Sequence, residues 1–146
     1  MRLPMNITGL ANSKMDLNKM DGNLFEKLGY EIARKLQGKV IGYIPPSYPL
    51  NYFRLDIKKD ENTMSILLHE HFPHVAIASY ENELQMHFLD HEDLMTELRT
   101  YYTVLETTFL NEPFNPNSHD LAEIELKNAK HWGPNINGEV IFNCWD

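Results

Sequence analysis

The chain has little of what marks a secreted or membrane-spanning protein. Its 146 residues include one cysteine, Cys144, so an intramolecular disulfide is excluded, and a free thiol favours a reducing compartment. No stretch approaches about 18 consecutive apolar residues, and the polar, interrupted N-terminus does not have the pattern of a secretion signal. We therefore expect a cytoplasmic protein that does not interact with membranes.

Common catalytic and nucleotide-binding signatures are also missing. The sequence has no Gly-rich phosphate loop, no Gly-x-Ser-x-Gly elbow and no cysteine pair for zinc. It has no basic stripe with interleaved aromatic residues, the pattern typical of nucleic-acid-binding proteins. What is present is ordinary for a packed domain, with 42% hydrophobic and 11% aromatic residues, so one core is expected.

Charge is distributed unevenly along the chain. Residues 1–59 contain ten Lys/Arg and five Asp/Glu, a net +5, whereas residues 60–146 contain three and sixteen, a net −13; together they give −8. An acidic surface repels phosphate backbones and attracts basic proteins. We therefore expect no nucleic-acid partner, and either a basic protein partner or a surface that only confers solubility.

The N-terminal part begins without regular structure. Residues 1–22 are polar and lack sustained periodicity, which predicts an N-terminal arm or loosely docked extension before a single domain over 23–146. The domain is expected to open with a helix over 24–37, capped by Asn23 and ended by Gly38. The basis is an apolar residue at every fourth position: Leu24, Leu28, Ile32 and Leu36.

Between residues 39 and 88 the apolar residues recur with a period of two, which predicts a meander of antiparallel strands with one buried face. The first two strands are expected over 39–44 and 52–58. A two-residue loop at Glu81-Asn82 would pair Ala76 with His87 in the last two strands. The residues expected on the buried face are Phe53, Leu55, Ile57, Met64, Ile66, Leu68, Val75, Ile77, Leu84, Met86 and Phe88.

The C-terminal part predicts more helix. Asp90 is the expected N-cap of a long second helix with an apolar stripe as far as Phe109, followed by a shorter helix over 116–129 and a last strand over 139–145. The predicted fold class is α+β. It has a single antiparallel, or partly mixed, sheet of five to six strands, with two to three helices packed mainly on one face. The expected order is α-β-β-β-β-β-α-α-β.

The histidines form the one group with the composition of a metal site. Because side chains alternate along a strand, four of them are expected to share the sheet face opposite the apolar one: His69, His71, His74 and His87. Three imidazoles held about 2 Å from an ion, completed by a carboxylate such as Glu70, Glu83 or Asp90, would bind zinc or another divalent metal. The same residues would equally form a polar sheet face with no cofactor.

Two functional hypotheses follow. A compact acidic α+β domain without an evident active site resembles bacterial immunity and antitoxin proteins in general character, which implies a non-enzymatic module that occludes a partner. The charge distribution itself points to a basic protein partner and to these acidic residues: Glu92, Asp93, Glu97, Glu106, Asp120, Glu123 and Glu125. The alternative is a metal-dependent enzyme of hydrolase type that uses the histidines, a metal-bound water and Glu83 or Asp90 as base. The sequence does not indicate an oligomeric state.

Overall fold

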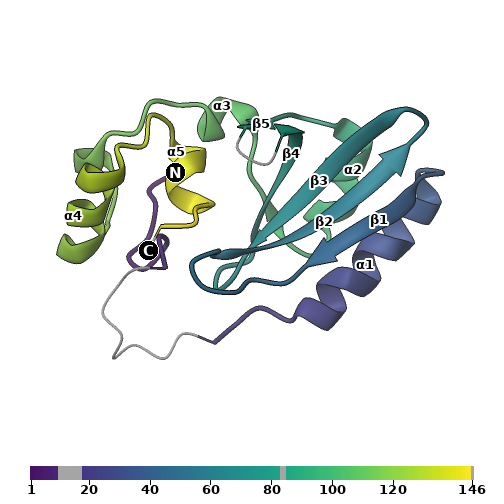
Figure 1. Cartoon of the computed structure of the whole chain (residues 1–146), viewed down its shortest axis with the longest axis horizontal. Coiled ribbons are helices and arrows are strands. Elements are labelled where there is room, and N and C mark those ends of the chain that lie inside the picture. The colour runs from purple at the N-terminus through teal and green to yellow at the C-terminus, as the bar shows by residue number, and fades with distance from the viewer. Residues whose placement is uncertain (10–17, 83–84, 146) are drawn as a thin grey trace.

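An antiparallel sheet in the strand order β1-β2-β3-β4-β5 forms the centre of the fold (Figure 1). The computed structural model describes residues 1–9, 18–82 and 85–145. A two-residue strand, β6 (Thr103–Val104), pairs in parallel with the start of β4. The predicted α+β class is confirmed, and the five strands follow the predicted order: β1 (Lys39–Ile44), β2 (Tyr52–Lys59), β3 (Asn62–His69), β4 (His74–Asn82) and β5 (Gln85–Phe88).

The first helix, α1 (Gly22–Lys35), lies where its four-residue period predicts, but both of its ends differ from the prediction. Asp21, rather than Asn23, is the N-cap: its carboxylate accepts a hydrogen bond from the amide of Leu24 at 3.0 Å. At the other end the residue with positive φ is Gln37, at 60°, and not Gly38. The Gly38 amide then donates to the Ala33 carbonyl, which closes the last turn.

Both faces of the sheet are covered, and each has its own core. The first core is the predicted apolar face, where α1 and α2 (Glu92–Arg99) pack on residues such as Leu55 and Ile66. The second core lies on the opposite face of the sheet and includes Leu67 of β3. It joins the N-terminal segment to α3 (Thr107–Leu110), α4 (Glu123–Trp132), α5 (Asn137–Ile141) and the C-terminal residues. Figure 1 shows α4 and α5 at the end of the molecule opposite α1 and α2.

The first nine residues belong to the second core, which corrects the expectation of a loosely docked arm for this stretch. Leu3 and Ile7 are completely buried. Asp120 donates its amide to the Leu3 carbonyl at 2.9 Å, so the segment is also held by the backbone. Apolar residues at two isolated positions leave no period in the sequence, which is why this docking was not predicted.

The pairing of β4 with β5 differs from the predicted register. Ser79, rather than Ala76, lies opposite His87, and β4 continues through Asn82 with an irregularity after Tyr80. Side chains alternate between the two faces along a strand, so a shift by three positions, an odd number, moves every side chain of β5 to the other face. Met86 and Phe88 therefore pack on the second core. The predicted burial of Leu84 lies outside the described residues.

The predicted long helix from 90 to 109 is replaced by α2, β6 and α3. The chain leaves the helical path because β4 has a free edge next to β5: Thr103 donates its amide to Pro73, and Leu105 donates to Val75 at 2.9 Å. Asp90 was predicted to cap α2, but its carboxylate instead accepts hydrogen bonds from the amide and hydroxyl of Thr107 at the start of α3.

The last two predicted elements are also corrected. In place of the helix over 116–129, a short 3-10 turn at Pro116–Ser118 precedes α4. In place of a strand over 139–145, the chain forms α5 and then an irregular end, in which Cys144 is exposed and Trp145 is buried. A short apolar run fits a helix or a strand equally well, so sequence alone did not decide. No helix in the described part of the chain has both the length and the apolar character needed to cross a bilayer.

Candidate functional site

The helix α2 presents a fixed acidic surface. Leu94, Met95 and Leu98 are each at most 2% exposed and anchor its inner side to the first core. The imidazole of His91 caps the helix, with Nδ1 accepting a hydrogen bond from the Leu94 amide at 3.2 Å. The outward first turn carries exposed Glu92, where negative charge meets the positive end of the helix dipole. The surface is therefore preorganised by packing and by its cap.

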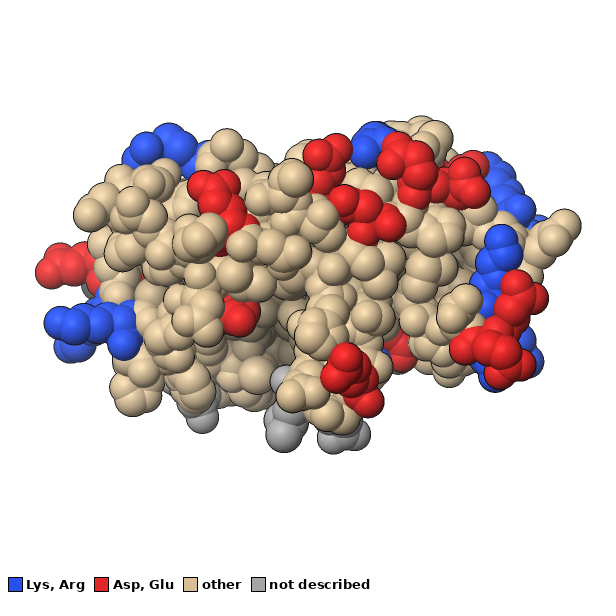
Figure 2. Space-filling view, turned by 90° about the horizontal axis from the view of Figure 1, so that it is seen from above, with Lys and Arg blue, Asp and Glu red and all other residues tan. Residues whose placement is uncertain are grey.

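Negative charge accumulates around this helix. Residues 90–106 contain five acidic residues and one basic residue, Arg99, a net charge of −4. Arg99 is already shared, because Nη1 lies 3.4 Å from Glu92 and Nη2 lies 3.5 Å from Glu106. Figure 2 shows acidic side chains gathered on the half of the molecule that holds the sheet, and more thinly on the other half. We name this surface the α2 acidic face: Asp90, Glu92, Asp93, Glu97 and Glu106.

The structure separates the seven acidic residues that the sequence grouped together. Four of them lie on the α2 acidic face, of which Glu97 forms an ion pair with Lys35 of α1 at 3.2 Å. Asp120 and Glu123 lie just before and at the start of α4, at the opposite end of Figure 1. Asp120 is exposed and pairs with Arg2, which lowers the pKa of its carboxyl.

Glu125 is not available to a partner, which corrects its prediction as a contact residue. It is completely buried and accepts hydrogen bonds from the amides of Asn6 at 2.7 Å, Thr8 at 2.9 Å and Ala122 at 3.0 Å. The Thr8 hydroxyl donates to it as well. The carboxylate thus joins the N-terminal segment to the first turn of α4, and its role is structural. Sequence could not distinguish it from Glu123, two residues earlier.

The four histidines do not form the predicted cluster. His69 and His74 do lie on the second face, near one another, but the β5 register puts His87 on the first face, beside Glu81 at 3.3 Å. His74 stacks on the ring of Phe72, and its Nδ1 is buried without a hydrogen-bond partner among the described residues. Within those residues no group of three or more His, Cys, Asp or Glu side chains is placed to hold a metal ion.

Both ring nitrogens of His69 form hydrogen bonds with the backbone. Nδ1 accepts the amides of His71 at 3.0 Å and Phe72 at 3.2 Å, so Nε2 carries the proton and donates to the Ile7 carbonyl at 2.6 Å. Burial is the main cause that lowers the pKa of His69 to about 4. The neutral ring therefore has no lone pair left for a metal. It fixes the turn after β3 and holds the N-terminal segment.

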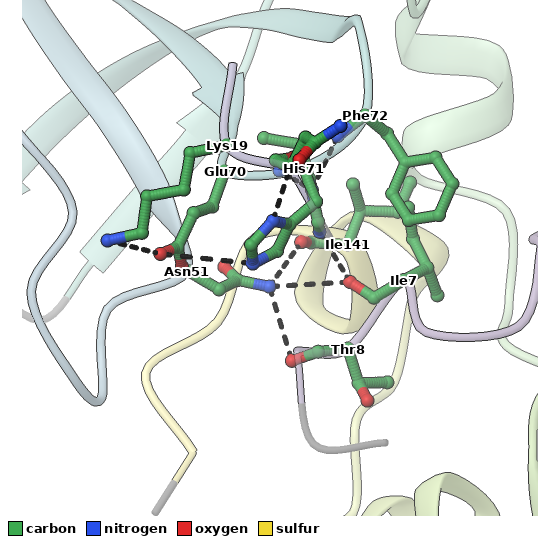
Figure 3. A network of polar contacts seen from close by, with 10 residues as sticks. Ile7, Thr8, Lys19, Asn51, Glu70, His71, Phe72 and Ile141 are labelled. Atoms are coloured by element: carbon green, nitrogen blue, oxygen red, sulfur yellow. Dashed lines mark hydrogen bonds and ion pairs between the residues drawn. The ribbon is translucent and has the colours of Figure 1, made fainter. Parts of the chain in front are cut away.

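A network of polar contacts around Asn51 completes this junction (Figure 3). Its side-chain amide donates to the Ile141 carbonyl at 2.9 Å and, over longer distances, to Ile7 and Thr8. Its side-chain carbonyl accepts the Asn143 amide at 2.8 Å. Asn51 thus ties the N-terminal segment, the C-terminal residues and the start of β2 together. Nothing in its local sequence distinguishes this asparagine from one in a solvated loop.

A pocket of about 280 Å³ opens next to the network, between the loop over 46–51 and residues 70–71. Glu70 Oε1 lies 3.3 Å from the Lys19 ammonium and 3.9 Å from Nε2 of His71. Nδ1 of His71 lies 3.1 Å from the Asn18 carbonyl and therefore carries a proton. Figure 3 shows the side chains of Lys19 and His71 beside Glu70, so the carboxylate at this pocket is already paired.

A second polar group lies on the sheet face itself and was not predicted. Arg54 stacks over the ring of Tyr80 at 3.6 Å and pairs with Asp56 at 2.9 Å, while the hydroxyl of Tyr80 lies 3.3 Å from that of Tyr52. Burial, together with the neighbouring Tyr52, raises the pKa of Tyr80, so its phenol stays protonated at neutral pH. The alternating polar positions of β2 are the signal that indicates such a face.

Comparison with known proteins finds no match: no family model fits the chain, and neither the curated proteins nor the solved structures contain a significant relative. The function of the chain is therefore inferred from its own geometry and charge.

Proposed function

We propose that this protein is a non-enzymatic binding module, of the immunity or antitoxin type, whose α2 acidic face docks a basic protein partner. The observation that carries the proposal is the local charge: residues 90–106 contain five carboxylates and one arginine, which Glu92 and Glu106 share. A rigid surface of one sign speeds encounter with a partner of the opposite sign and makes binding sensitive to salt.

Exposure and an aromatic neighbour support this role. The Glu92 side chain is 79% exposed and that of Glu106 is 57% exposed, so both can be desolvated by a partner. Tyr101 follows α2 and is 51% exposed, so its ring is accessible to a partner. Tyrosine is enriched among the residues that dominate interface energetics, because its ring buries much area with little loss of conformational freedom. We expect Tyr101 to be the apolar anchor within the acidic face.

The proposal is tested with two variants of equal charge. E92K/D93K/E106K reverses the α2 acidic face, and E61K/E112K/E123K reverses three exposed carboxylates elsewhere; each variant changes the net charge from −8 to −2. Affinity capture from the native cell at low salt, with quantification of bound proteins, is expected to return a stoichiometric basic protein on the wild type and on the control variant. Reversal of the α2 acidic face should abolish that capture, and higher salt should weaken it.

Two results would contradict the proposal. One is the absence of any stoichiometric basic protein on the wild type. The other is an equal loss of capture in both variants, which would show a dependence on overall charge rather than on this face. The thermal midpoint of each variant is measured first, because the substituted side chains are exposed and a large drop would indicate misfolding.

A further inference from the structure

The strand β1 forms an edge of the sheet and leaves one side of its backbone unpaired. Among the described strands it pairs only with β2. Two large apolar side chains on it are exposed, Ile41 at 51% and Ile44 at 47%. Native proteins usually protect an edge with charge, shortness or proline, because a free row of N–H and C=O groups recruits other strands. β1 has a lysine at its start, a bulge after Val40 and a proline directly after its end, but its two exposed isoleucines lack such protection.

A groove runs beside this edge. It has a volume of about 410 Å³ and lies between the C-terminal half of α1 and the start of β1. Its lining combines apolar surface with two basic side chains: Tyr30, Ala33, Arg34, Gly38, Lys39 and Val40. Tyr30 is 51% exposed, so its ring is accessible from the groove. An apolar depression next to a free strand is the arrangement that proteins use to accept an added strand.

Three basic side chains at this edge form no ion pair among the described residues: Arg34, Lys39 and Lys58. Lys39 of β1 lies directly opposite Lys58 of β2 in the ladder, a like-charge pair that disfavours pairing. Within the described residues neither lysine, nor Arg34, forms an ion pair; Lys35, by contrast, is bound to Glu97. Figure 2 shows basic side chains together with acidic ones at the end of the molecule where α1 ends and β1 begins. An acidic group placed here would relieve the repulsion.

We infer that the β1 edge and its groove bind an extended acidic segment of another protein by strand addition. Main-chain hydrogen bonds to β1 supply affinity, alternate apolar side chains enter the groove, and acidic side chains meet Arg34, Lys39 and Lys58. The bulge between Val40 and Gly42 interrupts the ladder, so the paired stretch is expected to be short.

Charge also favours an acidic segment over a second copy of this chain as the occupant of the β1 edge. A second copy would present another β1 edge, and the residues of β1, Lys39–Ile44, include no carboxylate that could meet Arg34 and Lys39. The β1 edge is distinct from the α2 acidic face and has the opposite sign. The inference therefore stands whether or not that face binds a basic protein.

The probe is a fluorescein-labelled peptide of about ten residues that alternates Glu and Val, compared with one that alternates Lys and Val. Fluorescence anisotropy at low salt is expected to show that the Glu peptide binds at least about tenfold more tightly. Hydrogen exchange followed residue by residue should show slower exchange of the outward amides within 39–44 when the Glu peptide is bound, because those amides gain acceptors.

Two charge-matched variants locate the site. R34E/K39E reverses the groove, and K127E/K130E reverses two exposed lysines of α4; each changes the net charge from −8 to −12. The first is expected to weaken binding of the Glu peptide about tenfold, and the second to leave it nearly unchanged. The E92K/D93K/E106K protein should still bind the Glu peptide, which separates this inference from the proposed function.

The inference is overturned by unchanged exchange over 39–44, by equal binding of the two peptides, or by equal weakening in the two variants. It is also overturned if the β1 amides become protected on concentrating the protein alone, since the occupant would then be a second copy. Tighter binding of a single-stranded oligonucleotide than of the Glu peptide would identify the basic groove as a nucleic-acid site instead.

Discussion

Protonation of one buried imidazole is expected to destabilise the fold in mild acid. His69 is completely buried, and its neutral ring accepts two amides and donates to the Ile7 carbonyl. Burial lowers its pKa in the folded state from 6.5 to about 4. A proton therefore binds the unfolded chain more tightly, so acid favours unfolding. The contribution of His69 is fully present above pH 6.5 and is lost progressively as the pH falls from 6.5 to 4.

The magnitude follows from the two pKa values. A difference of about 2.5 pH units, at about 1.4 kcal/mol for each, corresponds to about 3 kcal/mol of stability. Such a loss is a large fraction of the total for a domain with a free energy of unfolding of about 5–15 kcal/mol. The N-terminal segment should be released first, because His69 donates to Ile7 in that segment.

Urea unfolding at pH 7, 5.5 and 4, monitored by tryptophan fluorescence, measures this effect. The variant H69N keeps an acceptor near the position of Nδ1 but does not titrate, so it should lose about 3 kcal/mol less than the wild type between pH 7 and pH 4. At pH 7 it should be about 1–3 kcal/mol less stable, because the bond to Ile7 is gone. H131N removes an exposed imidazole and serves as the control, with the pH dependence of the wild type. Identical slopes for H69N and the wild type would show that His69 is not the group whose protonation destabilises the fold.

Three further predictions concern the second core. E125A leaves buried amides without an acceptor and should lower the free energy of unfolding by about 3 kcal/mol, whereas D120A, at an exposed ion pair, should have a much smaller effect. Equal effects would contradict the assigned role. L3A should lower the free energy of unfolding by about 2–5 kcal/mol, and M5A by much less, in the same chemical denaturation. An unchanged free energy of unfolding in L3A would mean that the N-terminal segment is not part of the core. G138A places a methyl group against the Phe88 ring and should lower the thermal midpoint, while an unchanged midpoint would show that the ring can move.

The candidate site was predictable in part. Four of the acidic residues assigned to a partner do surround α2, because a local excess of carboxylates with few nearby cations remains an excess after folding. Glu125 was misassigned, since its burial depends on amides of Asn6 and Thr8 that lie almost the whole chain away. The exposed edge at Ile41 was also not predicted, because apolar residues at an edge and in a core have the same sequence pattern.

The histidines show how one local uncertainty changes a site. Placement of His87 on the second face required a turn at Glu81-Asn82, and β4 instead runs through both of these residues. Because side chains alternate along a strand, the odd shift moved His87 to the other side of the sheet, and the predicted ligand set was lost.

The helix α1 and the strands β2 to β4 were predictable from the sequence, because each contributes apolar residues to the first core, and a period of four or of two identifies those residues. What covers the opposite face depends instead on contacts between residues that lie far apart in the sequence. The N-terminal segment, β6, α3 and α5 are too short to have a period of their own, so their conformation depends on distant hydrogen-bond partners. Val75 and Glu125 are two such partners, and the backbone groups they bind would otherwise be buried unpaired.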